Sequence, residues 1–188
     1  MTQTIAGERY QQTLGYILVT PARRLPLFLG RAVPVIVNGF FVGVFALVVG
    51  GAILRIDVPA SAYAPLALVT AVAAYSCTGL GLINAALGLI IRETAVLSNI
   101  IFGLLLIFTG ANVPIDDLPA WMQAVSEVLP FTHAIEAARE LADGASLADV
   151  SGLVGAEALI GTVYVAVGYA MLRWVEIVSR RRATLEKA

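Results

Sequence analysis

The sequence predicts an all-α membrane protein with four transmembrane helices, on three observations. Four runs carry no charged residue, namely 32–54, 58–91, 94–115 and 158–172, and roughly 20 apolar helical residues cross a bilayer core about 30 Å thick. Of all residues, 59% are hydrophobic and 13% are charged, whereas soluble domains average about 45–50% and about 25%. The arginines cluster beside the uncharged runs. We expect one membrane domain over residues 1–188, with spans at 27–54, 65–91, 94–113 and 147–177.

The N-terminal segment, residues 1–26, is expected to lie in the cytoplasm. Its apolar residues recur at helical spacing, namely Tyr10, Leu14, Ile17 and Leu18, and this spacing predicts an amphipathic helix over 8–19. Pro21 ends the helix, because a proline disfavours the helical conformation in the residue before it.

The first two spans carry signs of close helix packing. Gly39 and Gly43 form a Gly-x-x-x-Gly pair in the first span, which lets a second helix approach closely, although glycines are also common in membrane helices. The second span is rich in Ala, Gly and Ser and contains Asn84 and Cys77. For Asn84 a hydrogen bond between helices is favoured over contact with a substrate. Cys77 is the only cysteine, and we interpret it as a buried packing residue.

The outer segment, residues 114–145, predicts a re-entrant hairpin of two short helices. Asp116 or Asp117 is expected to cap the first helix, with Pro119 in its first turn. One apolar stripe then follows, made of Leu118, Trp121, Met122, Val125 and Leu129. The outer hairpin residues are Pro114, Leu118, Trp121, Pro130, Thr132 and His133. Pro130 breaks the first helix, and Thr132 begins a second that runs to about Ala142.

Four polar side chains lie in or near this segment. Ser146 and Asp149 have the spacing of a capping box that opens the last span. Glu157 is the one acid near membrane depth. An ionisable group there indicates function by default, but we favour a side chain that reaches out to the headgroups. His133 stands alone, so a capping or interfacial role is favoured over catalysis.

The basic residues predict that both termini are cytoplasmic. In this orientation all of the 12 Lys and Arg residues except Arg55 and Arg139 lie inside or at the inner interface, as the positive-inside rule requires. We therefore expect a multi-pass protein of the cell inner (plasma) membrane. Its sequence contains no nucleotide-binding Gly-x-x-x-x-Gly-Lys-Ser/Thr loop and no metal-binding His or Cys motif, so no cofactor and no metal are predicted.

Short motifs in the N-terminal part of the chain and in the outer segment resemble those of a known family. The N-terminal segment reads GERYQQTL at 7–14, TPARR at 20–24 and LGR at 29–31. The outer segment reads NVPI at 112–115, LPAW at 118–121, LPFTH at 129–133 and AR at 138–139. With four spans in this order, the chain resembles the membrane subunit of an ABC-2-type exporter, of the daunorubicin-resistance type. Such permeases usually have six spans, and this chain resembles the last four.

The resemblance implies a permease subunit of an ATP-driven exporter for a hydrophobic, drug-like, glycan or lipid-linked substrate. It implies two partners besides membrane lipid: a separate ATPase subunit that hydrolyses ATP, and a second permease copy in a homo- or heterodimer. No nucleic-acid partner is implied. A coupling helix would dock on the ATPase, with the residues Glu8, Arg9, Leu14, Ile17, Leu18, Arg23 and Arg24.

Two other classes of function stay open on the sequence. One is a small membrane anchor or accessory subunit without its own transport path. The other is an intramembrane enzyme such as a lipid transferase, which would need clustered His, Asp or Glu at membrane depth. The sequence offers only Glu157 and the turn at Arg92 and Glu93 for such a cluster, so the transport permease is the leading hypothesis.

Overall fold

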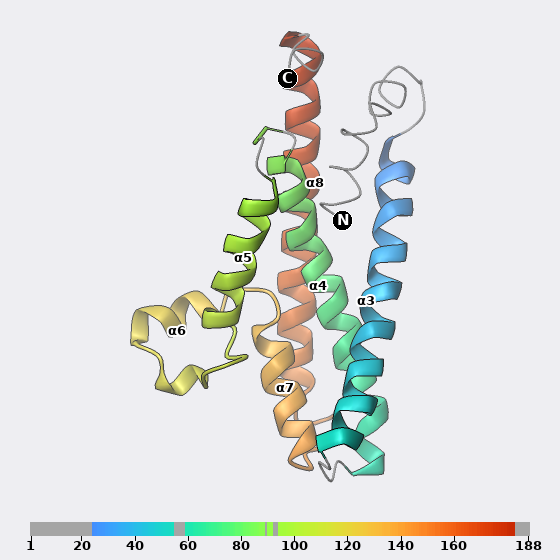
Figure 1. Cartoon of the computed structure of the whole chain (residues 1–188), viewed down its shortest axis with the longest axis vertical. Helices are drawn as coiled ribbons and strands as arrows, with labels where there is room; N and C mark the ends of the chain where they lie inside the picture. Colours follow the sequence, from blue (N-terminus) through green and yellow to red (C-terminus); the bar gives the residue numbers. More distant parts are fainter. Residues whose placement is uncertain (1–23, 55–58, 89, 92–93, 183–188) are drawn as a thin grey trace.

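Helices make up every regular element of the part of the chain that the computed structural model describes, residues 24–54, 59–88, 90–91 and 94–182. Three long helices lie along the long axis of the molecule (Figure 1): α3 (Arg24–Leu54), α4 (Tyr63–Gly88) and α8 (Ser151–Arg182). The shorter elements are η1 (Ala60–Ala62), α5 (Thr94–Phe108), η2 (Ile115–Asp117), α6 (Ala120–Ser126) and α7 (Thr132–Ala142). The predicted all-α fold is therefore confirmed for the described residues.

The number of membrane spans is one point where structure and sequence differ. Among the described residues, three helical segments are long and apolar enough to cross a membrane: Val33–Ile53, Ala60–Gly88 and Ser151–Val175. Helix α5 is apolar but has only 15 residues, fewer than the roughly 20 that a crossing needs. It stops at Phe108 because the turn that follows contains Gly110 at φ +75°, a left-handed conformation that only glycine adopts readily. A fourth crossing at 94–113 stays a prediction.

Helices α4 and α8 form the closest pair among the described helices, and they run in the same direction (Figure 1). Three glycines lie at their contact, and a Cβ atom on any of them would collide with the other helix. A Cβ atom on Gly79 would lie 2.8 Å from the Tyr164 Cβ, and one on Gly168 would lie 2.7 Å from the Leu82 Cβ. At Gly161 it would lie 2.9 Å from the Ser76 Cα. Small residues thus allow the two backbones to approach as membrane helices commonly do.

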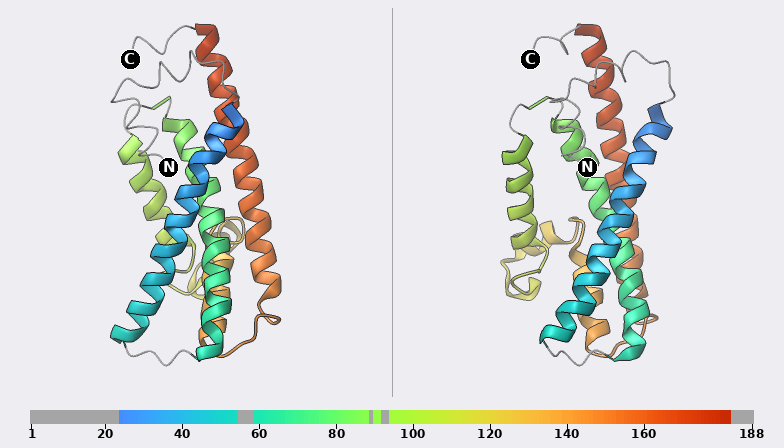
Figure 2. Two further views of the ribbon diagram at one scale, coloured as in Figure 1. Left: turned by 90° about the vertical axis from the view of Figure 1, so that its right-hand side faces the viewer. Right: turned by 45° about the vertical axis from the view of Figure 1, so that its right-hand side comes forward.

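The apolar core lies where α7 packs against α4 and α8, at the end of the molecule where α3 joins α4 (Figure 2). Its buried side chains are Ala62, Leu66, Val69 and Ala73 from η1 and α4, Ala134, Ala137 and Leu141 from α7, and Val150 before α8. A second, smaller cluster of Leu82, Ala86 and Leu172 joins the other halves of α4 and α8. Helix α7 is therefore part of the core and not a loop laid on its surface.

The predicted capping of α6 by an acid is wrong. Asp116 and Asp117 lie in η2, and the residue before α6 is Pro119, which makes no side-chain cap. The extended Leu118 between η2 and α6, with ψ 152°, carries the two acids away from the helix. The Gln123 amide instead ties the segment together by donating to the Leu118 carbonyl at 2.8 Å.

Candidate functional site: a cavity beside α7

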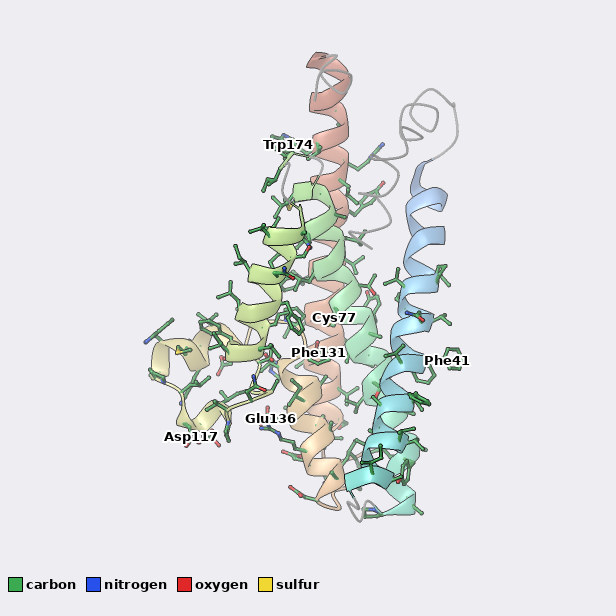
Figure 3. All side chains as sticks on the ribbon, in the orientation of Figure 1. Phe41, Cys77, Asp117, Phe131, Glu136 and Trp174 are labelled. Atoms are coloured by element: carbon green, nitrogen blue, oxygen red, sulfur yellow. The ribbon has the colours of Figure 1, made fainter. Side chains whose placement is uncertain are left out.

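A cavity of about 450 Å³ opens between α3, α4 and α7. We call it the α3–α4–α7 cavity, and Figure 3 labels two of its residues, Cys77 on α4 and Phe131 at the start of α7. Its lining residues are Val35, Gly39 and Gly43 of α3, Val69, Thr70, Ala73, Ala74, Cys77, Thr78 and Gly81 of α4, and Phe131, Ala134, Ile135 and Ala138 of the α7 segment. Its volume is in the range of about 300–1,000 Å³ that is common for small-molecule sites.

The cavity wall is apolar even where it contains hydroxyl groups. Thr70 donates its hydroxyl to the Leu66 carbonyl at 2.8 Å, and Thr78 donates to the Ala74 carbonyl at 2.7 Å. Both bonds stay within α4, so the hydroxyls are satisfied by their own helix. No lining residue is ionised at neutral pH. The cavity therefore suits an apolar guest and offers no ion pair to a charged one.

The glycine pair of α3 sets the width of this cavity. A Cβ atom on Gly43 would lie 2.5 Å from the Thr70 Cγ2, whereas one on Gly39 would lie 3.5 Å from the Ala74 Cβ. Since real Cβ atoms almost never approach to 2.5 Å, any larger residue at 43 would require the Thr70 side chain or α3 itself to shift. At Gly39 the two helices have begun to separate, and the cavity lies along that separation.

Behind α7, on the side of α8, Glu157 is fully buried. Its Oε1 accepts a hydrogen bond from the Phe131 N–H at 2.7 Å, and its Oε2 accepts one from the Ala134 N–H at 3.4 Å. The expectation that Glu157 reaches the headgroups is wrong, because the unpaired N–H groups at the start of α7 lie closer. Glu157 therefore joins α8 to the first turn of α7.

Helices α6 and α7 of the outer segment are also bonded to the C-terminal end of α5 and to the turn after it. Arg139 of α7 donates from Nη2 to the Gly110 carbonyl at 2.6 Å, and Ser126 of α6 donates its hydroxyl to the Phe108 carbonyl. The Phe108 carbonyl is the last of α5 and the Gly110 carbonyl lies in the turn that follows, where the helix dipole favours positive charge and hydrogen-bond donors. The ring of Trp121 lies edge-on to Phe108, with ring centroids 6.0 Å apart.

The predicted outer hairpin residues are divided between surface and core. Pro114 and Trp121 are exposed, Leu118 and His133 are half-buried, and Pro130 and Thr132 are buried. Thr132 begins α7, but the residue that occupies the N-cap position is Phe131, which has no capping side chain. The Nδ1 of His133 and the hydroxyl of Thr132 are buried without a hydrogen-bond partner among the described residues. Neither side chain forms a nucleophile–base pair there.

The remaining predicted residues lie away from the cavity or outside the described residues. Asn84 is buried on α4 and donates from Nδ2 to the Ser98 hydroxyl of α5 at 2.8 Å, a bond between two helices. The coupling residues Glu8, Arg9, Leu14, Ile17, Leu18 and Arg23 lie outside the described residues, and Arg24 is the first residue of α3. In the described part of the chain, no group of three or more His, Cys, Asp or Glu is placed to hold a metal ion.

Sequence reasoning missed two residues that organise this region, Gly161 and Arg139. Gly161 lies in a run of apolar residues with no glycine three or four positions away, so no close-packing motif marks it. Arg139 enters the sequence analysis as part of a motif and as one of two basic residues outside, and its position in the last turn of α7 gives no sign of its acceptor 29 residues earlier.

Comparison with known proteins now identifies the family. The sequence pattern of the ABC-2 type transporter matches residues 1–142 of this chain. The chain belongs to the ABC-2 type transporter family. The match covers α3 to α7, so the helices that line the cavity are elements of an ABC-2 membrane domain.

Curated relatives of this ABC-2 chain are named as permeases. The chain is 25% identical over 140 residues to a probable multidrug ABC transporter permease, YbhR, of Escherichia coli K12, and equally to its counterpart in E. coli O157:H7. The aligned part covers 73% of this chain but only 37% of the relative. No solved structure matches the chain. The chain is thus a multi-pass membrane protein of a transport permease family, and it spans about a third of the length of these relatives.

Proposed function

We propose that this chain forms part of the membrane path of an ATP-driven exporter and that the α3–α4–α7 cavity receives a hydrophobic, drug-like or lipid-linked substrate. One observation carries the proposal: a cavity of about 450 Å³ inside a transport-permease domain, with an apolar wall whose two threonine hydroxyls bond to their own helix. Burial of apolar surface is the driving force that such a wall offers to a guest. The name of the relatives, a multidrug permease, supports this class of substrate.

Binding of a neutral apolar probe tests this proposal. The probe N-phenyl-1-naphthylamine fluoresces in apolar surroundings and carries no charge, so it suits this wall. We expect Ala74→Phe, which fills the cavity, to weaken saturable binding of the probe to the protein in nanodiscs by about tenfold. Ala46→Phe is the matched control, because Ala46 is exposed on α3 and does not line the cavity. Equal binding by both variants would contradict the proposal.

The partners belong to the same proposal. ABC-2 permeases as a family work with an ABC ATPase and as dimers, and we propose that 8–24 docks on that ATPase as a cytoplasmic coupling segment. Leu14→Asp is expected to reduce co-purification of the ATPase subunit, because it places a charge on the apolar face of the predicted helix. Thr4→Asp, in the same segment but before that helix, should leave co-purification unchanged. Undiminished co-purification with Leu14→Asp would exclude this segment as the docking element.

We propose a plasma-membrane location with both termini in the cytoplasm. This rests on the distribution of Arg and Lys along the sequence. Reporter fusions at Gly144 and at Ala188 should report opposite sides of the membrane. The same side for both would contradict the arrangement of α8 as a single crossing between them.

A further inference from the structure

The start of α7 is held by a side chain from another helix. The residue at its N-cap position, Phe131, has φ +86°, and it is the one non-glycine residue with positive φ among those described. This conformation is unfavourable for a residue with a Cβ atom. The Phe131 N–H donates to the Glu157 Oε1 at 2.7 Å, so α8 supplies the bond that fixes Phe131 in this conformation.

A carboxylate is chemically suited to this position. The first N–H groups of a helix have no acceptor within the helix, and the helix dipole gives that end a partial positive charge. Phe131 offers no side-chain acceptor, and the carboxylate of Glu157 accepts from the first turn in its place. Glu157 lies six residues, about 9 Å, into α8, and burial of this carboxylate is tolerable only because these donors satisfy it.

The same residues form one wall of the cavity. The amides that Glu157 binds belong to Phe131 and Ala134, and both residues line the α3–α4–α7 cavity together with Ile135. Helix α7 therefore has Glu157 behind it and the cavity in front of it. Any movement of its first turn away from Glu157 changes the shape of the cavity.

We propose that Glu157 is a positioning residue, which holds α7 as the wall of the α3–α4–α7 cavity, and that loss of its two hydrogen bonds opens the cavity to water. This inference assigns a role to Glu157 within the proposed function. It rests on that function only for the interpretation of the cavity as a substrate site. The cavity exists in the structure whatever its guest is.

Cys77 provides a direct test, because it lines the cavity and is the only cysteine of the chain. A maleimide reacts with the thiolate, so the labelling rate of Cys77 in nanodiscs depends both on access of reagent to the cavity and on the charge of Glu157 near the thiol. Glu157→Ala and Glu157→Gln remove the same charge, so the difference between these two variants reports access. We expect Glu157→Ala to raise the labelling rate by about tenfold, the effect of losing one charge-assisted hydrogen bond. Glu157→Gln keeps one acceptor oxygen and should give a smaller rise.

Two matched variants separate this role from a general loss of charge or stability. Glu136→Gln removes an acid from an exposed position on α7 and should label like the wild type. Leu172→Ala removes a buried side chain from the smaller α4–α8 cluster, far from α7, and lowers stability without touching the Glu157 contacts. Even where Leu172→Ala loses as much thermal stability as Glu157→Ala, it should leave the labelling rate of Cys77 at the wild-type value.

The proposal is overturned if Glu157→Ala labels at the wild-type rate or no faster than Glu157→Gln, or if Leu172→Ala labels as fast as Glu157→Ala. Hydrogen exchange on the wild type decides the case even where the Ala variant does not fold. The amides of Phe131 and Ala134 should exchange at least tenfold more slowly than the amide of the exposed Asp116; equal exchange would overturn the proposal.

These outcomes are independent of the proposed transport function. Faster labelling of Glu157→Ala together with unchanged probe binding by Ala74→Phe would support the positioning role and contradict the substrate site. A wild-type labelling rate in Glu157→Ala, together with loss of probe binding in Ala74→Phe, would contradict the positioning role and support the substrate site.

Discussion

Gly161 of α8 lies against Ser76 of α4, so closely that a Cβ atom on Gly161 would be 2.9 Å from the Ser76 Cα and 3.1 Å from its Cβ. No side chain fits between these two backbones. The contact lies one helical turn after Glu157 on α8. It therefore sets how closely α8 can approach α4.

Gly161→Ala is expected to destabilise the protein by about 1–3 kcal/mol, because the new methyl group must push two backbones apart. Gly155→Ala is the matched control on the same helix. A Cβ atom at Gly155 meets nothing within 4 Å, so this variant should be neutral or gain up to about 1 kcal/mol of helix propensity. Thermal unfolding in detergent measures both, and equal midpoints for the two variants would contradict the close contact.

Ser76→Ala is expected to stabilise the protein by about 1 kcal/mol. The Ser76 side chain is fully buried, and its hydroxyl has no hydrogen-bond partner among the described residues. Removing an unsatisfied hydroxyl recovers the cost of its burial, and alanine also has a higher helix propensity than serine. The free energy of unfolding in a denaturing detergent is the measurement. A loss of stability would indicate that this hydroxyl does have a partner.

Arg139→Met is expected to cost about 1 kcal/mol, because the Gly110 carbonyl loses its donor while the apolar stem of the side chain is kept. Arg139→Lys should recover part of this loss, since it restores the charge but not the planar guanidinium. Glu140→Gln, at the exposed neighbouring position on α7, serves as the control. The prediction fails if Arg139→Met and Glu140→Gln have the same midpoint of thermal unfolding.

Asp149 gives a pH-dependent prediction outside the membrane-spanning helices. The Ser146 hydroxyl and N–H donate to the Asp149 Oδ2 at 2.7 and 2.9 Å, and these bonds hold the pKa of Asp149 below its usual 3.8. A lowered pKa in the folded state adds stability above pH 3.8, and this is lost as the pH falls through the folded-state value. The wild type should therefore exceed Asp149→Asn in midpoint at pH 6 and lose part of that advantage at pH 3.

Asp143→Asn is the control for this pH dependence, because Asp143 is an exposed acid before the same turn. A change of the same size between pH 6 and pH 3 in Asp143→Asn would show that the effect does not come from the Ser146 bonds. An Asp149→Asn difference that is constant over this range would show that the Ser146 bonds do not depend on the carboxylate charge.

The sequence by itself determined the helices and the family. Apolar runs, prolines and glycines act on their own neighbourhood of the chain, so Pro130, Thr132 and Gly144 were enough to predict the bounds of α7. The small residues of α4 likewise predicted a helix that packs closely, and the order of motifs predicted the ABC-2 family. These features need no knowledge of which helix lies beside which.

The tertiary structure alone decided which faces meet. Gly79 could have met any small residue, and its contact with α8 came from a parallel pairing that no local pattern specifies. Ser126 and Arg139 bond the carbonyls of Phe108 and Gly110, at and just after the end of α5, from far along the chain, and no local pattern specifies these partners. Glu157 has the same character: in sequence it is a single acid in an apolar run, and its burial becomes favourable only because α7 brings two unpaired N–H groups to it.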